Sequence, residues 1–319
     1  LFRSCMAGAA DAPESSGARK FSFRPLRLRN NSQSTMNAIL PLFVRWDVNP
    51  TMISIGSFEI RYYGLLWAIA LGISAYIFHN IMQREGLSEK TFDSIFWFGV
   101  ISTVVGARLG HCLFYDPGYY LTHPIEILDI RQGGLASHGA AFGLLLGLWL
   151  FSRKNKMPYI WSLDRISIAV AISGVAVRLG NLMNSEIYGT VTSLPWGFIF
   201  VRDGETLPKH PTQIYEALCY LVLFIILWWM YYKKDTARRR PGLMFGFFLI
   251  VLFGTRFLIE FIKNPQEDFE VNMLLNMGQL LSIPFILTGI VILWCALRKP
   301  PLDPAPLKKS FSGTPAKRK

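Results

Sequence analysis

Residues 166–189 read ISIAVAISGVAVRLGNLMNSEIYG, an apolar run that passes without a break into a polar motif. The first half is typical of a membrane helix, so the motif that begins at Arg178 lies at or near membrane depth. A charged side chain in hydrocarbon is costly and normally faces the interior of a helix bundle, where it marks a substrate or ion pathway. On a continuing helix, Arg178, Asn181 and Ser185 share one face. An arginine beside amides suits an anionic ligand that carries hydroxyl groups, such as a lipid head group.

The composition of the whole chain agrees with a membrane protein. Of its 319 residues, 51% are hydrophobic and only 17% are charged, a balance typical of an all-α polytopic membrane protein. The third apolar run is short for a span of about 20 residues, so it is either extended by its glycine-rich lead-in or partly buried in the bundle. The seven runs long enough to cross are roughly 61–83, 91–114, 136–151, 161–180, 213–232, 242–263 and 276–297.

Basic residues alternate along the loops between these runs. One set of loops holds only Arg131, Arg202 and Lys209, whereas the other set and the C-terminal tail are rich in lysine and arginine. The positive-inside rule therefore predicts seven spans with the N-terminus outside and the C-terminus in the cytoplasm. The net charge of +12 then reflects cytoplasmic loops beside anionic membrane lipid, and no nucleic-acid partner is expected. The basic loop residues are Arg84, Lys90, Arg153, Lys154, Lys156, Lys233, Lys234, Arg238, Arg239 and Arg240.

The two ends of the chain differ from its apolar middle. Residues 1–35 carry six basic side chains and no apolar run long enough for a signal peptide. Because this charge opposes an outside N-terminus, we interpret residues 1–35 as a start-site artefact or a disordered leader. Residues 36–299 are then the seven-span domain and residues 300–319 a basic cytoplasmic tail. N-terminal sequencing of the native protein tests this, since a mature chain that begins well before Met36 would contradict it.

Cysteine usage bears on the chemistry. The four cysteines, Cys5, Cys112, Cys219 and Cys295, are scattered without a CxxC pair. Three of them lie in apolar runs, where a thiol behaves as a small hydrophobe. The sequence therefore predicts neither a disulfide framework nor a metal site, and no cofactor. If thiol chemistry occurs here, we expect the thiol to belong to a substrate.

Two further polar positions leave two interpretations each. Tyr63, beside Gly64 at the head of the first run, is either an interfacial anchor, which the sequence alone favours, or a head-group ligand. Arg108 in the second run needs a partner at depth. An ion pair with Glu260 or Glu186 is as well supported by the sequence as contact with a ligand.

His138 lies in the first turn of the third run. It follows the paired glycines 133 and 134 and precedes small residues that would leave space beside it. A lone histidine is most often a satisfied core residue. Here the setting favours a functional one, because neutral imidazole is well suited to accept a proton near pH 7.

Arg256 and Glu260 in the sixth run are i,i+4 neighbours and could neutralise each other. The alternative is that two inward arginines from different runs, Arg178 and Arg256, share one ligand. Two guanidinium groups could hold a phosphate and stabilise the charge that it gains on leaving.

Together, these motifs resemble the prolipoprotein diacylglyceryl transferases of bacteria. They occur in the family order, over about residues 52–298, and their joint occurrence makes the resemblance specific. The motifs are GG at 133–134 with HG at 138–139, RLGNLMNSEIYG at 178–189, HPTQIYE at 210–216, RFLIEF at 256–261 and MGQLLSIP at 277–284.

The resemblance implies an activity and a place in the cell. Such enzymes move the diacylglyceryl group of phosphatidylglycerol to the lipobox cysteine thiol in the signal peptide of a prolipoprotein, forming a thioether and releasing glycerol phosphate. We therefore expect a multi-pass protein of the bacterial inner membrane, with its active site toward the outer leaflet and membrane lipid as a substrate.

The resemblance also implies roles for particular residues. The essential arginines of the family fall on Arg178 and Arg256, and its glycine-flanked histidine falls on His138, which we expect to act as the base. The first-span tyrosine falls on Tyr63 and the signature asparagine on Asn181. Together with Arg178, the residues expected to bind the substrate are Tyr63, Asn181, Asn184, Glu186, Gly189 and Glu260.

Three positions depart from the family pattern. Ala140 and Ser185 stand where glycine is usual, and Lys263 stands where arginine is common. Two rival functions also fit intramembrane polar residues. A transporter or channel is disfavoured because the Arg178 motif has no second copy and the number of spans is odd. A lipid-binding scaffold would explain the arginines but leaves His138 without a role.

Overall fold

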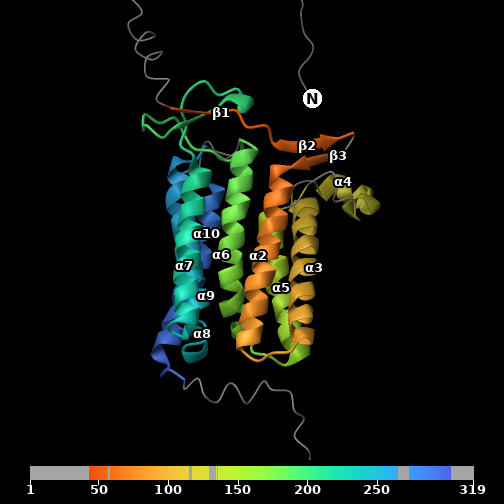
Figure 1. Cartoon of the computed structure of the whole chain (residues 1–319), viewed down its shortest axis with the longest axis vertical. Helices are drawn as coiled ribbons and strands as arrows, with labels where there is room; N and C mark the ends of the chain where they lie inside the picture. The colour runs from red at the N-terminus through yellow and green to blue at the C-terminus, as the bar shows by residue number, and fades with distance from the viewer. Residues whose placement is uncertain are drawn as a thin grey trace, which may run out of the picture. The chain divides into compact units, whose positions relative to one another are not determined.

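The computed structural model describes residues 43–56, 58–114, 117–128, 134, 136–264 and 273–302. The proposed leader and nearly all of the basic tail lie outside these residues. Long helices pack side by side, and neighbours along the chain run in opposite directions (Figure 1). They are α2 (Tyr62–Arg84), α3 (Glu89–Phe114), α5 (Ser137–Asn155), α6 (Tyr159–Met183), α7 (Thr212–Tyr232), α9 (Leu243–Ile259, continued by the 3-10 turn η4, Glu260–Ile262) and α10 (Met277–Arg298).

These helices lie where the apolar runs predicted spans. Within the described residues, six of them are long and apolar enough to cross a membrane, and α5 is the exception. The polytopic, mostly helical fold is confirmed, whereas the count of seven spans and the orientation stay predictions. Helix α5 nevertheless has 19 residues and lies along α3 over most of its length.

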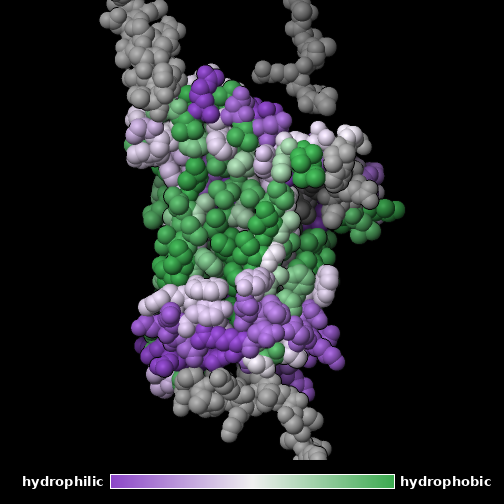
Figure 2. All heavy atoms as spheres, viewed as in Figure 1, coloured by the Kyte–Doolittle hydropathy of each residue, from purple (hydrophilic) through white to green (hydrophobic). Residues whose placement is uncertain are grey.

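Helix α6 is the centre of the bundle, because it contacts α2, α5, α7 and α9. Its C-terminal polar motif therefore faces other helices on several sides. At one end of the bundle α6 ends and α2 and α7 begin, and we call this end the site end. The opposite end, which carries the lysine- and arginine-rich loops, is the basic end. Figure 2 shows the apolar belt between them and the hydrophilic residues gathered beyond it at both ends.

Short strands at the site end were not predicted. β1 (Val44–Trp46) pairs in parallel with β4 (Phe198–Phe200), and β2 (Thr51–Ile55) pairs in antiparallel with β3 (Phe58–Arg61). The indole of Trp46 donates to the carbonyl of Leu182 at 2.9 Å, which ties β1 to the end of α6. Short helical segments also lie between the long helices at this end: α4 (Pro117–Thr122), the 3-10 turn η2 (Pro124–Leu128) and the 3-10 turn η3 (Val201–Asp203).

Helices α3 and α5 touch through their backbones. A Cβ atom built on Gly139 would lie 2.2 Å from the carbonyl oxygen of Gly106, and one on Gly143 would lie 2.0 Å from that of Ser102. Small residues allow such close approach in a membrane, where apolar packing replaces the hydrophobic effect. Two of the small residues after His138, Gly139 and Gly143, therefore serve the close packing of α5 against α3.

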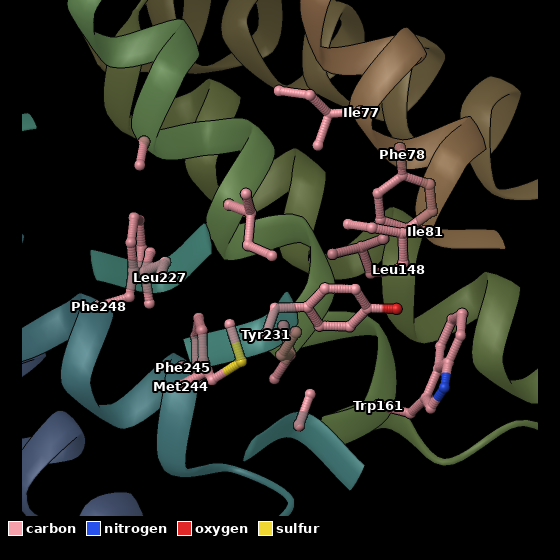
Figure 3. Packing of buried hydrophobic residues seen from close by; sticks show 14 of the residues in the cluster. Ile77, Phe78, Ile81, Leu148, Trp161, Leu227, Tyr231, Met244, Phe245 and Phe248 are labelled. Carbon is pink, nitrogen blue, oxygen red and sulfur yellow. The ribbon is translucent and has the colours of Figure 1, made fainter. Parts of the chain in front are cut away.

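The apolar core is densest toward the basic end. Side chains from α2, α5, α6, α7 and α9 meet there (Figure 3). Glu85, directly after α2, lies among them and accepts hydrogen bonds from Trp161, Arg165 and Tyr231 at 2.8–2.9 Å. We call these four residues the basic-end network. Beside it, the carboxylate of Asp164 accepts from the backbone amides of Gly242 and Phe245 and so caps α9, whose preceding turn contains the short helix α8 (Thr236–Arg239).

Candidate active site

The end of α6 sets the direction of the polar motif. Ser185 has a φ of 56°, its amide donates to the carbonyl of Leu182, and the amide of Glu186 donates to the carbonyl of Asn181, both at 3.0 Å. This is a Schellman ending, in which the left-handed position is usually glycine. The prediction that Ser185 continues the helical face is therefore wrong, because the helix ends before it. The chain instead turns back toward α6.

This turn brings the carboxylate of Glu186 to the amides of the motif. Asn181 and Asn184 both donate to Glu186 Oε1, at 2.7 and 3.3 Å. Asn181 Oδ1 in turn accepts from Arg178 Nη1 at 3.2 Å. Arg178 Nε lies 2.6 Å from Glu216 Oε2 of α7. The four motif residues predicted to share a site are thus one connected chain of contacts.

A second cation extends this chain. Lys263 Nζ lies 2.9 Å from Glu216 Oε1 and 3.1 Å from Glu260 Oε2, and all three side chains are buried. A Cβ atom on Gly278 would clash with the Glu260 carboxylate, so this glycine makes room for it. The sequence interpretation that Glu260 neutralises Arg256 is wrong, because Glu260 pairs with Lys263. We call Arg178, Asn181, Glu186, Glu216, Lys263 and Glu260 the site network.

Two tyrosines contact glycines of α6 that precede and follow Arg178 in the sequence. A Cβ atom on Gly180 would lie 2.7 Å from the Tyr63 ring, and one on Gly174 would lie 2.9 Å from the Tyr220 ring. The charges of Glu186 and Arg178 both act on Tyr63. Tyr63 therefore packs against α6 beside the polar motif, and its predicted contact with a head group stays a prediction.

Arg256 comes to the same region from α9. Arg178 hydrogen-bonds to Tyr220, and the charge of Arg256 also reaches this tyrosine, so guanidinium groups of two helices lie in the same region of the bundle. The charge of Arg256 also acts on His138, which begins α5 with an exposed side chain. Within the described part of the chain, no carboxylate lies within ion-pairing distance of Arg256. The predicted grouping of Arg178, Arg256 and His138 at one end of the bundle is thus present.

Gly189 closes the motif by packing. Its amide donates to the carbonyl of His210 at 2.8 Å, and a Cβ atom there would lie 2.4 Å from the carbonyl oxygen of Ile262. Contact with backbone on two sides explains a glycine at this position. Its predicted contact with a substrate stays a prediction.

Arg108 does not join the site network. It donates to the backbone carbonyls of Glu126, Ile127 and Gly134, at 2.7, 2.9 and 3.3 Å. Within the described residues, Glu260 and Glu186, the ion-pair partners that the sequence allowed, are instead bonded to Lys263 and to the two asparagines. Arg108 holds the segment between α3 and α5 in place.

Two titratable groups lie in the loops beside the site. Tyr188 donates to the carboxylates of Asp203 and Glu205, and burial together with these two charges raises its pKa, so that it stays a neutral donor. Burial lowers the pKa of His210, whose ring lies 3.3 Å from the hydroxyl of Tyr215. Both residues therefore remain uncharged at neutral pH.

The sequence interpretation missed Glu216, Lys263 and Gln213 as site residues, although their motifs were noted. The usable signal was that a carboxylate near the start of an apolar helix, as Glu216 is in α7, needs a cation at the same depth. Which cation pairs with this carboxylate depends on how α6, α7 and the end of α9 pack together. Residue spacing carries no information about that packing. Among the described residues, no three His, Cys, Asp or Glu side chains are grouped to hold a metal ion.

Comparison with known proteins shows the family to which the chain is related. Residues 50–295 match the family of prolipoprotein diacylglyceryl transferases. The chain belongs to this family. It is similar to the phosphatidylglycerol–prolipoprotein diacylglyceryl transferases of Porphyromonas gingivalis (46% identical; 82% of this chain and 97% of the relative covered), Bacteroides fragilis (43%; 81% and 97%) and Tolumonas auensis (43%; 78% and 95%).

Family membership confirms the resemblance drawn from the motifs. It makes the chain a transferase and decides against the transporter, channel and scaffold alternatives. The family match begins and ends close to the limits that the motifs predicted.

Proposed function

We propose that Arg178 and Arg256 together hold the phosphate of phosphatidylglycerol while the chain transfers the diacylglyceryl group to a prolipoprotein. The transfer itself is the activity named for the relatives, and family membership assigns it to this chain. The observation that carries the proposal is that α6 and α9 both end at the site end, where Arg178 hydrogen-bonds to Tyr220 and the charge of Arg256 also reaches this tyrosine. Guanidinium stays protonated and can bind two phosphate oxygens at once.

The reaction requires a nucleophile from outside the chain. The thiol of a lipobox cysteine, with an ordinary pKa of about 8.5, becomes a thiolate and attacks the glyceryl carbon that bears the phosphate ester. A C–S bond forms, the C–O bond breaks, and glycerol phosphate leaves with the bonding electron pair. Negative charge grows on the departing phosphate, where preorganised positive groups stabilise the transition state most.

His138 is the group that we assign to the thiol proton. It begins α5 at the site end, its side chain is exposed, and the charge of Arg256 reaches it. A base at the same end of the bundle as the phosphate-binding arginine can take the proton directly or through water. The polar side chains around Arg178 suit the hydroxyl groups of the glycerol head group, and they are Tyr63, Asn181, Asn184 and Glu186.

The proposal includes a membrane arrangement. Seven spans, with α5 as the third, bring the N-terminus outside and direct the site network toward the outer leaflet of the bacterial inner membrane. Support comes from the alternation of basic loops and from α5, whose 19 residues correspond to about 28 Å of helix, close to the hydrocarbon thickness.

A mass measurement tests the activity. Purified protein is incubated with phosphatidylglycerol and a lipobox peptide, and the peptide is weighed. We expect a mass increase equal to one diacylglyceryl group, and none when the peptide cysteine is replaced by serine. A protein that binds the lipid but leaves the peptide mass unchanged would contradict the proposal.

A second experiment tests the base. His138→Gln keeps a polar side chain but cannot accept the proton, so we expect a large loss of kcat and loss of the acidic limb of the pH–rate profile. If kcat falls little and the profile keeps its shape, His138 is structural and another group takes the proton.

A further inference from the structure

The turn that carries Glu186 has an unusual backbone. Ser185 and Ile187, on either side of Glu186, have φ angles of 56° and 62°. Positive φ is uncommon outside glycine and is a marked outlier for a β-branched residue such as Ile187. Residues in such conformations persist only when the surrounding structure holds them there, and they cluster at functional sites.

Two neighbouring side chains in the first turn of α7 hold this turn. Thr212 Oγ1 donates to the carbonyl of Ile187 at 2.8 Å, and Gln213 Nε2 donates to the carbonyl of Glu186 at 2.7 Å. Both side chains are fully buried. Consecutive carbonyls of the strained turn are thus fixed by consecutive residues of another helix.

The carboxamide of Gln213 donates to the carbonyl of Glu186, but its own oxygen is left unsatisfied by the described residues. Its Oε1 atom is buried and has no hydrogen-bond partner within the described part of the chain. A buried polar atom without a partner is unfavourable. An apolar side chain of the same size would avoid this penalty but would lose the bond to the turn.

We propose that Thr212 and Gln213 are positioning residues that hold the strained turn and thereby aim the Glu186 carboxylate at the head group. This rests on the proposed function, in which Glu186 binds that head group. Without the two bonds, the turn relaxes toward ordinary backbone angles. Glu186 then leaves the position in which Asn181 and Asn184 donate to it.

Two substitutions test the clamp in the full-length protein in lipid. Gln213→Met keeps the volume and Thr212→Val keeps the shape, but each loses its donor. We expect each to raise the KM for phosphatidylglycerol about 10-fold, while the KM for the lipobox peptide and the midpoint of thermal unfolding change little. Thr212→Ser, which keeps the hydroxyl group, should retain the wild-type KM. Thr288→Val is the matched control, since its hydroxyl bonds only to its own helix.

A second-site change separates strain from packing. In the Gln213→Met background, Ile187→Gly removes the penalty for positive φ and should recover most of the affinity for phosphatidylglycerol. Ile187→Ala shortens the same side chain but keeps the Cβ atom and its clash, so it should not. Equal recovery by glycine and alanine would overturn the proposal. If Gln213→Met fails to insert into the membrane, the KM for phosphatidylglycerol of Thr212→Val and Thr212→Ser tests the proposal. Ile187→Gly and Ile187→Ala are then made in the Thr212→Val background.

Glu186→Gln distinguishes failure of this proposal from failure of the function on which it rests. If Glu186→Gln raises the KM for phosphatidylglycerol but Thr212→Val and Gln213→Met do not, the clamp is wrong and the head-group role of Glu186 stands. If Glu186→Gln itself keeps the wild-type KM, Glu186 does not bind the head group and both ideas fail.

Discussion

The two buried charge networks of the bundle contain similar side chains, but the polar groups beside them differ in how fully they are satisfied. In the basic-end network, the carboxylate of Glu85 accepts hydrogen bonds from three residues of two other helices, and neighbouring Asp164 caps α9. Beside the site network, the buried side-chain oxygens of Ser185 and Gln213 lack partners within the described residues, and the turn from Ser185 to Ile187 is strained. Charged groups with all their partners in the protein hold helices together, whereas buried hydrogen-bonding atoms without a protein partner are available to a ligand.

The largest effect is expected on stability at the basic end. Glu85→Ala leaves Arg165 buried without its carboxylate, so the free energy of unfolding should fall by about 3–5 kcal/mol. Thermal unfolding in detergent measures the change. The transfer activity per folded molecule should be unaltered, and Glu89→Ala, at an exposed position on α3, should change neither quantity. A loss of specific activity in Glu85→Ala would break the distinction between the two networks.

The next effect is expected on activity at the site end. Arg178→Ala and Arg256→Ala should each lower the rate of thioether formation about 100-fold or more, because each removes a preorganised charge from the departing phosphate. Arg165→Ala is the counterpart at the basic end, and it should reduce stability without reducing the specific rate. Peptide mass, followed over time with each variant inserted in membranes, gives the rates. Near-wild-type activity in Arg178→Ala would remove the centre of the proposed function.

A smaller gain in stability is expected where a helix ends in a left-handed residue. Ser185→Gly removes the penalty for positive φ, and the free energy of unfolding should rise by about 1 kcal/mol. Lys156→Gly makes the same change at the basic end, where Lys156 caps α5 with a φ of 53°. Thermal unfolding should show similar gains for both. A destabilised Ser185→Gly variant would mean that the buried hydroxyl of Ser185 has a partner.

The smallest effect is a pH dependence at the site end. Because burial lowers the pKa of His210 in the folded state, the unfolded state binds more protons as the pH falls through about 6.5. Stability contributed by the neutral ring is therefore present above that pH and is lost as the pH falls toward the folded-state pKa. Unfolding midpoints measured from pH 7.5 to pH 5.5 should decline less in His210→Gln than in the wild type. Parallel declines would contradict this assignment.

Much of the site was predictable because single residues stand out against an apolar background. Arg178, Asn181, Asn184 and Glu186 are costly at membrane depth, which predicted that they lie together, and the structure brings the four side chains into contact. Which charges pair was not predictable. Glu260 is i,i+4 to Arg256, yet it bonds to Lys263, because the helix tightens into η4 at Glu260 and brings Lys263 to Glu216 of α7.

Sequence reasoning also failed where the backbone leaves regular geometry. The spacing placed Ser185 on the helix of Arg178, since nothing local to a serine predicts a left-handed residue. The hydrogen bonds from Thr212 and Gln213 that hold the following turn come from residues more than 20 positions away.

Apolar run length, the alternation of basic loops and the order of the motifs were sufficient to predict the helices, their approximate limits and the family. These are local properties, because each depends on whether one segment prefers lipid or water. The partners of the buried charges, the direction of Glu186 and the contrast between the two networks depend on how several helices pack. A low-dielectric interior requires each charge to find a partner, but only the arrangement of the helices in space determines which one it finds.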